Sequence, residues 1–163
     1  MNIDEISVDL PSSSDENDQP THKKTVFQEL NLNDDFVHHL TKLGFGKPTK
    51  IQELAIPTLI TGQDAIIISR TGSGKTLAYL IPLINKLNHH SNVAGVRGLI
   101  MAPTRELALQ IANVLKRLVT YQDHQLRVCL CTGGDSLEQQ FQALSLNPDV
   151  IVATPGRIQY HLE

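Results

Sequence analysis

Four short apolar runs, separated by stretches with helical periodicity, constrain the fold of this chain more than any other feature. The runs occupy residues 65–68, 99–102, 128–131 and 150–153. Continuous apolar runs of this length are typical of strands buried on both faces of a parallel sheet. Helical patterns at 75–88, 104–120 and 136–145 alternate with them, which favours right-handed crossover connections. The sequence therefore predicts an α/β domain: a parallel sheet flanked by helices, with ligand sites at the carboxyl ends of the strands.

The first 24 residues differ in composition from the rest of the 163-residue chain. They are rich in Ser, Asp, Asn, Gln and Pro, and six acidic residues against two lysines give them a net charge of −4. This composition predicts a disordered acidic tail over residues 1–24, to which we assign no chemistry. Residues 25–163 carry a net charge of +1, so bulk charge neither favours nor excludes a polyanionic partner.

Two classes of protein are excluded by simple counts. The chain has two cysteines, Cys129 and Cys131, too few for a disulfide framework or a structural zinc site. No apolar run reaches the length of a membrane span, and the N-terminus lacks the basic start and apolar stretch of a signal peptide. We therefore expect a soluble intracellular protein with no membrane partner.

A glycine-rich loop directly follows the first apolar run and precedes a helix. Its sequence is Ser69-Arg70-Thr71-Gly72-Ser73-Gly74-Lys75-Thr76. The glycines allow the backbone to curl so that N–H groups point at phosphate oxygens, and the helix N-terminus adds its positive end. In such a loop Lys75 reaches the terminal phosphates and Thr76 ligates Mg²⁺. A glycine turn that merely ends a strand is the alternative, but it leaves the Lys-Thr pair unexplained.

Five segments occur in order between residues 27 and 157. They are Gly44-Phe45-Gly46-Lys47-Pro48-Thr49-Lys50-Ile51-Gln52 with Phe27 seventeen positions before it, the glycine loop, Pro103-Thr104-Arg105-Glu106-Leu107-Ala108, Gly133-Gly134, and Thr154-Pro155-Gly156-Arg157. In these segments the chain resembles the N-terminal part of DEAD-box RNA helicases, and it departs from the family's loop motif at Ser69, where the family has alanine. The resemblance implies a RecA-like P-loop domain, ATP and Mg²⁺ as cofactors, and RNA as a partner.

The resemblance implies a nucleotide site formed by the first two segments. Its residues are Phe27, Lys50, Gln52, Arg70, Thr71, Gly72, Ser73, Gly74, Lys75 and Thr76, of which Lys75 and Thr76 are catalytic and Thr76 is the metal ligand. The amide of Gln52 can pair with N6 and N7 of adenine and reject guanine, and Phe27 is available to stack on the base. Thr49 and Gln52 also have capping-box spacing, so a purely helix-capping role for Gln52 stays open.

The remaining segments imply an RNA site. Its residues are Pro103, Thr104, Arg105, Gly133, Gly134, Thr154, Gly156 and Arg157. At Thr104 and at Thr154 a strand end, a helix N-terminus and a nearby arginine coincide, which suits a nucleic-acid phosphate. An ordinary helix cap with solvated charges is the alternative at Thr104. Contacts to phosphates and 2′-hydroxyls do not read bases, so we expect largely sequence-independent binding that distinguishes RNA from DNA.

The family's Asp-Glu-Ala-Asp motif is expected shortly after Arg157, but the sequence stops at Glu163. Residues 25–163 are therefore expected to form a partial first helicase lobe, truncated before that motif, that binds nucleotide and RNA without turnover. The parent protein would be an ATP-dependent RNA helicase, with RNA-stimulated hydrolysis driving duplex unwinding or remodelling of RNA–protein particles. A noncatalytic ATP- and RNA-binding module is one alternative. Another P-loop NTPase is the second, although the chain has no Asn-Lys-x-Asp motif for guanine.

Residues 134–144, together with Arg70, resemble the nucleolar branch of the family that acts in large-ribosomal-subunit assembly. This resemblance implies a role in ribosome biogenesis, pre-ribosomal particles as partners, and a location in the nucleolus and nucleus, with the cytoplasm as the alternative. We expect the protein to be a monomer.

Overall fold

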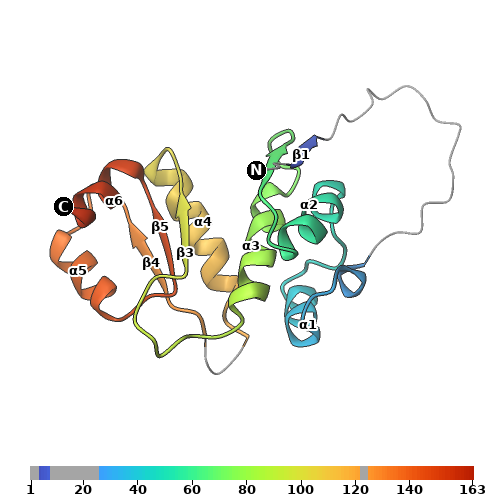
Figure 1. Cartoon of the computed structure of the whole chain (residues 1–163), viewed down its shortest axis with the longest axis horizontal. Coiled ribbons are helices and arrows are strands. Elements are labelled where there is room, and N and C mark those ends of the chain that lie inside the picture. Colours follow the sequence, from blue (N-terminus) through green and yellow to red (C-terminus); the bar gives the residue numbers. More distant parts are fainter. Residues whose placement is uncertain (1–3, 8–25, 122–124) are drawn as a thin grey trace, which may run out of the picture. The chain divides into compact units, whose positions relative to one another are not determined.

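The computed structural model describes residues 4–7, 26–121 and 125–163, which divide between two compact units (Figure 1). The first unit comprises Met1–Lys86 and the second Leu87–Glu163. Within the described residues no helix is both long enough and apolar enough to cross a membrane.

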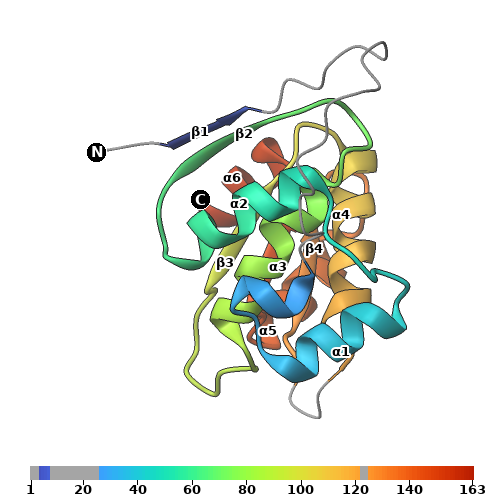
Figure 2. The same ribbon diagram turned by 90° about the vertical axis from the view of Figure 1, so that its right-hand side faces the viewer.

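The first unit contains two strands, a 3-10 helix and three α-helices. They are β1 (Asp4–Ser7), η1 (Phe27–Leu30), α1 (Asp34–Lys42), α2 (Lys50–Ile60), β2 (Ala65–Ile68) and α3 (Lys75–Leu87), whose last residue belongs to the second unit. Strand β1 pairs in parallel with β2, with Asp4 opposite Ala65 and Ser7 opposite Ile68 (Figure 2). The predicted disordered tail therefore differs from the structure at these four residues, while most of the tail lies outside the described part of the chain.

Helix α1 begins where its sequence provides a cap. The Asn33 side chain accepts hydrogen bonds from the backbone N–H groups of Asp35 and Phe36, over 2.9 and 3.4 Å. Such a cap satisfies two of the donors that a helix start leaves without partners. The helix ends just before Gly44, and its apolar side chains Phe36, Val37 and Leu40 are buried.

The second unit is a three-stranded parallel sheet with helices on both faces. Its elements are β3 (Gly98–Met101), α4 (Arg105–Leu118), β4 (Val128–Cys131), α5 (Leu137–Ser145), β5 (Val150–Ala153) and α6 (Pro155–Leu162). The strand order is β3-β5-β4, all parallel, with α4 on one face and α5 and α6 on the other (Figure 1). The predicted alternation of strands and helices is confirmed. The strand predicted at residues 99–102 is β3, which begins and ends one residue earlier, at 98–101.

Burial of the strands differs from the prediction in two places. The central strand β5 is buried along its whole length, because it has a neighbour on each side and helices on each face. On β2 and β3, however, every second side chain is about half exposed: Ile66 49%, Ile68 50%, Leu99 53% and Met101 59%. The expectation of strands buried on both faces is therefore wrong for β2 and β3. Strand β2 pairs with β1 in the first unit, and the other three strands form the sheet of the second unit.

A buried carboxylate fixes the start of the central strand. Asp149, 1% exposed, accepts hydrogen bonds from the backbone N–H groups of Ser91 and Arg127, and from the side chains of His90 and Arg97. Burial raises the pKa of this carboxyl group, but the hydrogen bonds from Arg127, His90 and Arg97 outweigh burial and hold the pKa below its usual value. The segment that precedes β3 and the residue that precedes β4 are thus both anchored to β5.

Candidate functional site

The glycine loop of the first unit has the curl that its sequence predicts. Gly72 and Gly74 have φ angles of +82° and +100°, a region that other residues rarely adopt. The N–H of Ser73 bonds to the carbonyl oxygen of Arg70, and the hydroxyls of Ser69 and Ser73 lie 2.6 Å apart. Helix α3 starts at Lys75, so the loop and a helix N-terminus meet as expected for a phosphate site.

Lys75 folds back onto its own loop. Its ammonium group donates to the carbonyl oxygens of Ser69 and Arg70, the latter over 2.8 Å. The positive charge that would meet a phosphate is thus held at the loop by backbone oxygens. The next residue, Thr76, is half-buried and hydrogen-bonds with Tyr79; burial raises the pKa of Tyr79 by more than this bond lowers it.

Gln52 joins the start of α2 to the glycine loop. Its Oε1 accepts the backbone N–H of Thr49 over 3.0 Å, and the Thr49 side chain accepts the backbone N–H of Gln52, which completes a capping box. Its Nε2 donates to the carbonyl oxygen of Gly74 over 3.1 Å. The helix-capping role that the sequence left open is therefore confirmed. The side chain is 2% exposed, and each polar atom keeps one unused bonding position.

The remaining residues of the predicted nucleotide site range from buried to exposed. Phe27, in η1, is 1% exposed, a burial close to that of Gln52. A large aromatic ring suits a hydrophobic core as well as a base contact, and the ring of Phe27 is part of the core. The ammonium of Lys50 lies 3.7 Å from a carboxylate oxygen of Glu53, one turn along α2. Arg70, Thr71 and Gly72 are exposed on the loop.

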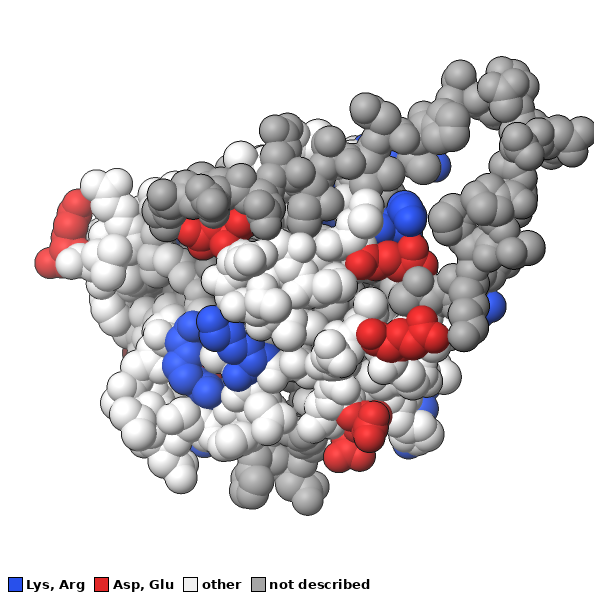
Figure 3. Space-filling model, turned by 45° about the vertical axis from the view of Figure 1, so that its right-hand side comes forward, with Lys and Arg blue, Asp and Glu red and all other residues white. Residues whose placement is uncertain are grey.

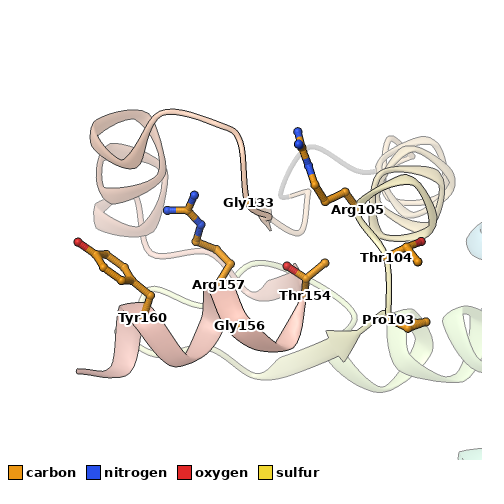
Figure 4. A pocket seen from close by; sticks show the side chains of 8 residues that line it. All are labelled: Pro103, Thr104, Arg105, Gly133, Thr154, Gly156, Arg157 and Tyr160. Carbon is orange, nitrogen blue, oxygen red and sulfur yellow. The ribbon is translucent and has the colours of Figure 1, made fainter.

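In the second unit, the loops that follow β3, β4 and β5 line a shallow, open pocket of about 600 Å³ (Figure 4). It is lined by Pro103, Thr104, Arg105, Gly133, Thr154, Gly156, Arg157 and Tyr160. All but Tyr160 are residues that the sequence assigns to an RNA site. The side chains of Arg105 and Arg157 project to the same side of the pocket. Gly134, although not part of the lining, supports it, because the guanidinium of Arg105 lies directly over its Cα.

The two threonines at the helix starts differ. The hydroxyl of Thr104 accepts the backbone N–H of Leu107 over 3.2 Å. Thr104 therefore caps α4, which is the alternative that the sequence left open. The side chain of Thr154 makes no capping bond, and Pro155 occupies the first position of α6, where its missing N–H costs nothing. A ligand therefore meets a free helix start at Thr154 and a capped one at Thr104.

Buried polar side chains behind the pocket hold its middle loop. Gln140, 4% exposed, donates to the carbonyl oxygen of Thr132 over 2.7 Å, and its Oε1 lies 2.8 Å from Nε2 of His161. The hydroxyl of Thr132 donates to Asp135 over 2.8 Å. The carboxylate of Asp135 lies 4.0 Å from the guanidinium of Arg105. Sequence reasoning missed Gln140 and His161; the helical period of α5 was the signal that separates the buried Gln140 from the exposed Gln139.

His161, near the end of α6, faces α5. Its ring makes edge contacts with Phe141 and Tyr160, at centroid distances of 5.1 and 6.0 Å. Its Nδ1 is buried and has no hydrogen-bond partner in the described structure. Burial, and then the positive charge of Arg157, lower the pKa of His161.

The surface charge is mixed. On the face shown in Figure 3, acidic side chains are scattered, and basic ones form one large compact group and several smaller patches toward the right-hand edge. Among the described residues, no three His, Cys, Asp or Glu side chains form a metal site. A cation at the glycine loop would therefore rely on the hydroxyl of Thr76 and on ligand oxygens, a donor set that suits Mg²⁺.

The comparisons with known proteins agree with this geometry. A family model described as DEAD/DEAH box helicase matches residues 49–163. The chain is similar to the ATP-dependent RNA helicase ddx54 of Dictyostelium discoideum, with 48% identity over 83% of this chain and 12% of that protein. It is also similar to the ATP-dependent RNA helicase DBP10 of Saccharomyces cerevisiae, with 42% identity over 94% of this chain and 15% of that protein. The chain thus spans less than a sixth of the length of these two relatives.

Solved structures show the same likeness. A DEAD box protein from the hyperthermophile Methanococcus jannaschii matches with a TM-score of 0.74 and 38% identity, over 84% of this chain and 36% of that one. The yeast DEAD-box splicing factor Prp28 matches with a TM-score of 0.75 and 33% identity, over 84% of this chain and 34% of that one. The expected α/β fold of the RecA-like P-loop kind is therefore confirmed.

Proposed function

The chain belongs to the DEAD/DEAH box helicase family. We propose that it provides the nucleotide-binding and RNA-binding sites of an ATP-dependent RNA helicase. In that activity, ATP binding and RNA-stimulated hydrolysis drive duplex unwinding or remodelling of RNA–protein particles. The observation that carries the proposal is that one chain contains two features: a glycine loop followed by Lys75, and a pocket lined by Arg105 and Arg157.

The nucleotide is held by the glycine loop. Its backbone N–H groups and the start of α3 receive the phosphates, and Lys75 exchanges its carbonyl partners for phosphate oxygens. Thr76 supplies a hydroxyl to Mg²⁺, which when bound neutralises phosphate charge. Gln52 contacts adenine through the bonding positions that the capping box and Gly74 leave unused. Phe27, which is 1% exposed, stacks on the base only if its ring turns out of the core.

RNA lies in the pocket of the second unit. Arg105 and Arg157 contact successive phosphates, and the free helix start at Thr154 receives another. These contacts are to the backbone of the nucleic acid, so binding is largely sequence-independent and depends on salt.

Residues 1–163 alone bind ATP and RNA without turnover. Phosphoryl transfer to water requires a carboxylate that organises the metal and the attacking water. No Asp or Glu directly follows strands β2, β3, β4 or β5, and Asp135, near the end of β4, is bonded to Thr132. Phosphate release from this polypeptide, measured with and without single-stranded RNA, should stay at background.

Calorimetric titration tests the nucleotide site. ATP and ADP should bind more tightly than GTP, and Lys75→Ala should abolish binding while circular dichroism remains native. Lys42→Ala, an exposed lysine on α1, is the matched control and should bind as the original chain does. Equal affinity for ATP and GTP would remove the adenine contact, and undiminished binding by Lys75→Ala would remove the phosphate site.

The pathway is proposed from the resemblance of residues 134–144 to the nucleolar branch and from similarity to DBP10 and ddx54. We place the protein in the nucleolus, as a monomer acting on pre-ribosomal particles. A fluorescent fusion should concentrate in the nucleolus, and the protein should co-sediment with large-subunit precursors. A uniformly cytoplasmic signal would contradict this assignment.

A further inference from the structure

Tyr160 is an exposed aromatic side chain at the edge of the RNA pocket. It is 53% exposed, and it lines the pocket one helical turn beyond Arg157 (Figure 4). Residues three apart on a helix share a face, so both side chains reach the same surface. The Cζ atom of Arg157 lies 5.9 Å from the centroid of the Tyr160 ring, within cation–π range.

The ring of Tyr160 is supported from behind. His161 meets it edge-on at a centroid distance of 6.0 Å and an interplanar angle of 82°. His161 is itself held by the hydrogen bond to Gln140 and by its edge contact with Phe141. An exposed aromatic ring that is already oriented loses little conformational entropy when a ligand covers it.

We propose that Tyr160 is a stacking platform for one base of a single-stranded RNA whose adjacent phosphate is contacted by Arg157. The proposal rests on the RNA-binding function proposed above and adds a base contact to a site otherwise made for the backbone. Every base has a π-face, so such stacking adds affinity with little sequence preference. The other lining residues offer guanidinium, hydroxyl and backbone groups, and the carboxylate of Asp135 lies outside the lining and 4.0 Å from the guanidinium of Arg105.

The test separates base from backbone by comparing two probes. One is a fluorescently labelled oligouridylate, and the other has the same length and ribose-phosphate backbone but lacks bases. Anisotropy titrations of the 163-residue chain measure the Kd of each. Tyr160→Ala should weaken binding of the oligouridylate by roughly fivefold or more and leave the abasic probe unchanged. Tyr160→Phe keeps the ring and should bind both probes as the original chain does.

Three further variants complete the design. Tyr160→Leu keeps an apolar side chain against His161 without an aromatic face, so it should show the same loss as Tyr160→Ala even if the alanine variant is less stable. Leu162→Ala, 81% exposed on the same helix and outside the pocket lining, should change neither Kd. Arg157→Ala should weaken both probes, because it removes a phosphate contact.

The outcomes distinguish this inference from the function on which it rests. If Arg157→Ala weakens both probes but Tyr160→Ala and Tyr160→Leu weaken neither, the stacking role is overturned and the RNA site stands. Equal weakening of both probes by the tyrosine variants also overturns stacking, because the ring would then support the backbone contact. If the unaltered chain binds neither probe, both proposals fail.

Discussion

The side-chain amide of Gln52 donates a hydrogen bond to the backbone carbonyl of Gly74, with the two atoms 3.1 Å apart. The same amide caps helix α2 through Thr49. The residue proposed to recognise the base and the loop proposed to hold the phosphates are therefore mechanically joined before any nucleotide arrives. A displacement of the glycine loop should therefore also disturb the start of α2. A substitution at Gly74 tests this link.

Gly74→Ala should destabilise the protein and disrupt the nucleotide site. A Cβ there would lie 2.6 Å from Nε2 of Gln52 and 2.8 Å from Oγ1 of Thr49, at a φ of +100°. Gly72→Ala is the matched control, since its φ is also positive but a Cβ would meet nothing within 4 Å. Urea unfolding should show a loss of about 1–2 kcal/mol for Gly72→Ala and a larger loss for Gly74→Ala. Equal losses would mean that the contact with Gln52 contributes nothing.

Gly134→Ala should weaken RNA binding by moving Arg105. A Cβ at this position would lie 2.3 Å from Nη1 of Arg105, so the guanidinium must leave its place over the loop. Gly133→Ala offers the comparison, because a Cβ there meets open space. The salt dependence of RNA affinity should become shallower for Gly134→Ala, by about one phosphate contact, and change less for Gly133→Ala. An unchanged salt slope in Gly134→Ala would show that Arg105 reaches phosphate from other positions.

Asp149→Asn should destabilise the second unit by about 3 kcal/mol at neutral pH, because it leaves Arg97 and the backbone donors facing an amide. The folded-state pKa of Asp149 is below its unfolded value of about 3.9. Its contribution is therefore fully present above about pH 4 and is lost as the pH falls through the folded-state pKa. Urea unfolding at pH 7 and at about pH 3 should show the gap between the two proteins narrowing in acid. A gap that stays constant would contradict this.

His161 should titrate below its ordinary pKa of about 6.5, and Arg157→Ala should raise its pKa without restoring it fully. Burial is the larger cause and survives the substitution. Because the folded-state pKa is depressed, stability is complete above about pH 6.5 and declines as the pH falls through the folded-state value. Following the imidazole resonance by NMR measures the pKa directly. If Arg157→Ala left it unchanged, the charge of Arg157 would not be felt at the ring.

Local patterns in the sequence were sufficient for most helices and strands of the described structure, and for most residues that line the pocket of the second unit. Apolar runs predicted β2, β4 and β5 at their observed bounds, and helical periodicity predicted α3, α4 and α5 to within two residues. Seven of the eight residues that line the RNA pocket were named in advance. These successes share a cause: a strand end, a glycine with positive φ and a helix start are each encoded within a few neighbouring residues.

What the sequence could not supply depends on long-range packing. An apolar run does not say which neighbours cover its two faces, so the half-exposed side chains of Ile66 and Met101 were missed. An aromatic residue upstream of a glycine loop suits a base or a core equally well, and Phe27 is in the core. Tyr160 reached the pocket only through the placement of α6 beside the other two strand ends, which no local pattern specifies.

The contacts of Lys75 have a consequence for how the loop meets its first ligand. The ammonium of Lys75 is bonded to the carbonyl oxygens of Ser69 and Arg70, so backbone dipoles of the loop itself stabilise its charge. When a triphosphate binds, the ammonium of Lys75 exchanges these carbonyl oxygens for phosphate oxygens. A bound triphosphate must therefore compete with two backbone carbonyl oxygens for the ammonium of Lys75, so part of the lysine–phosphate attraction is offset by the bonds that are given up.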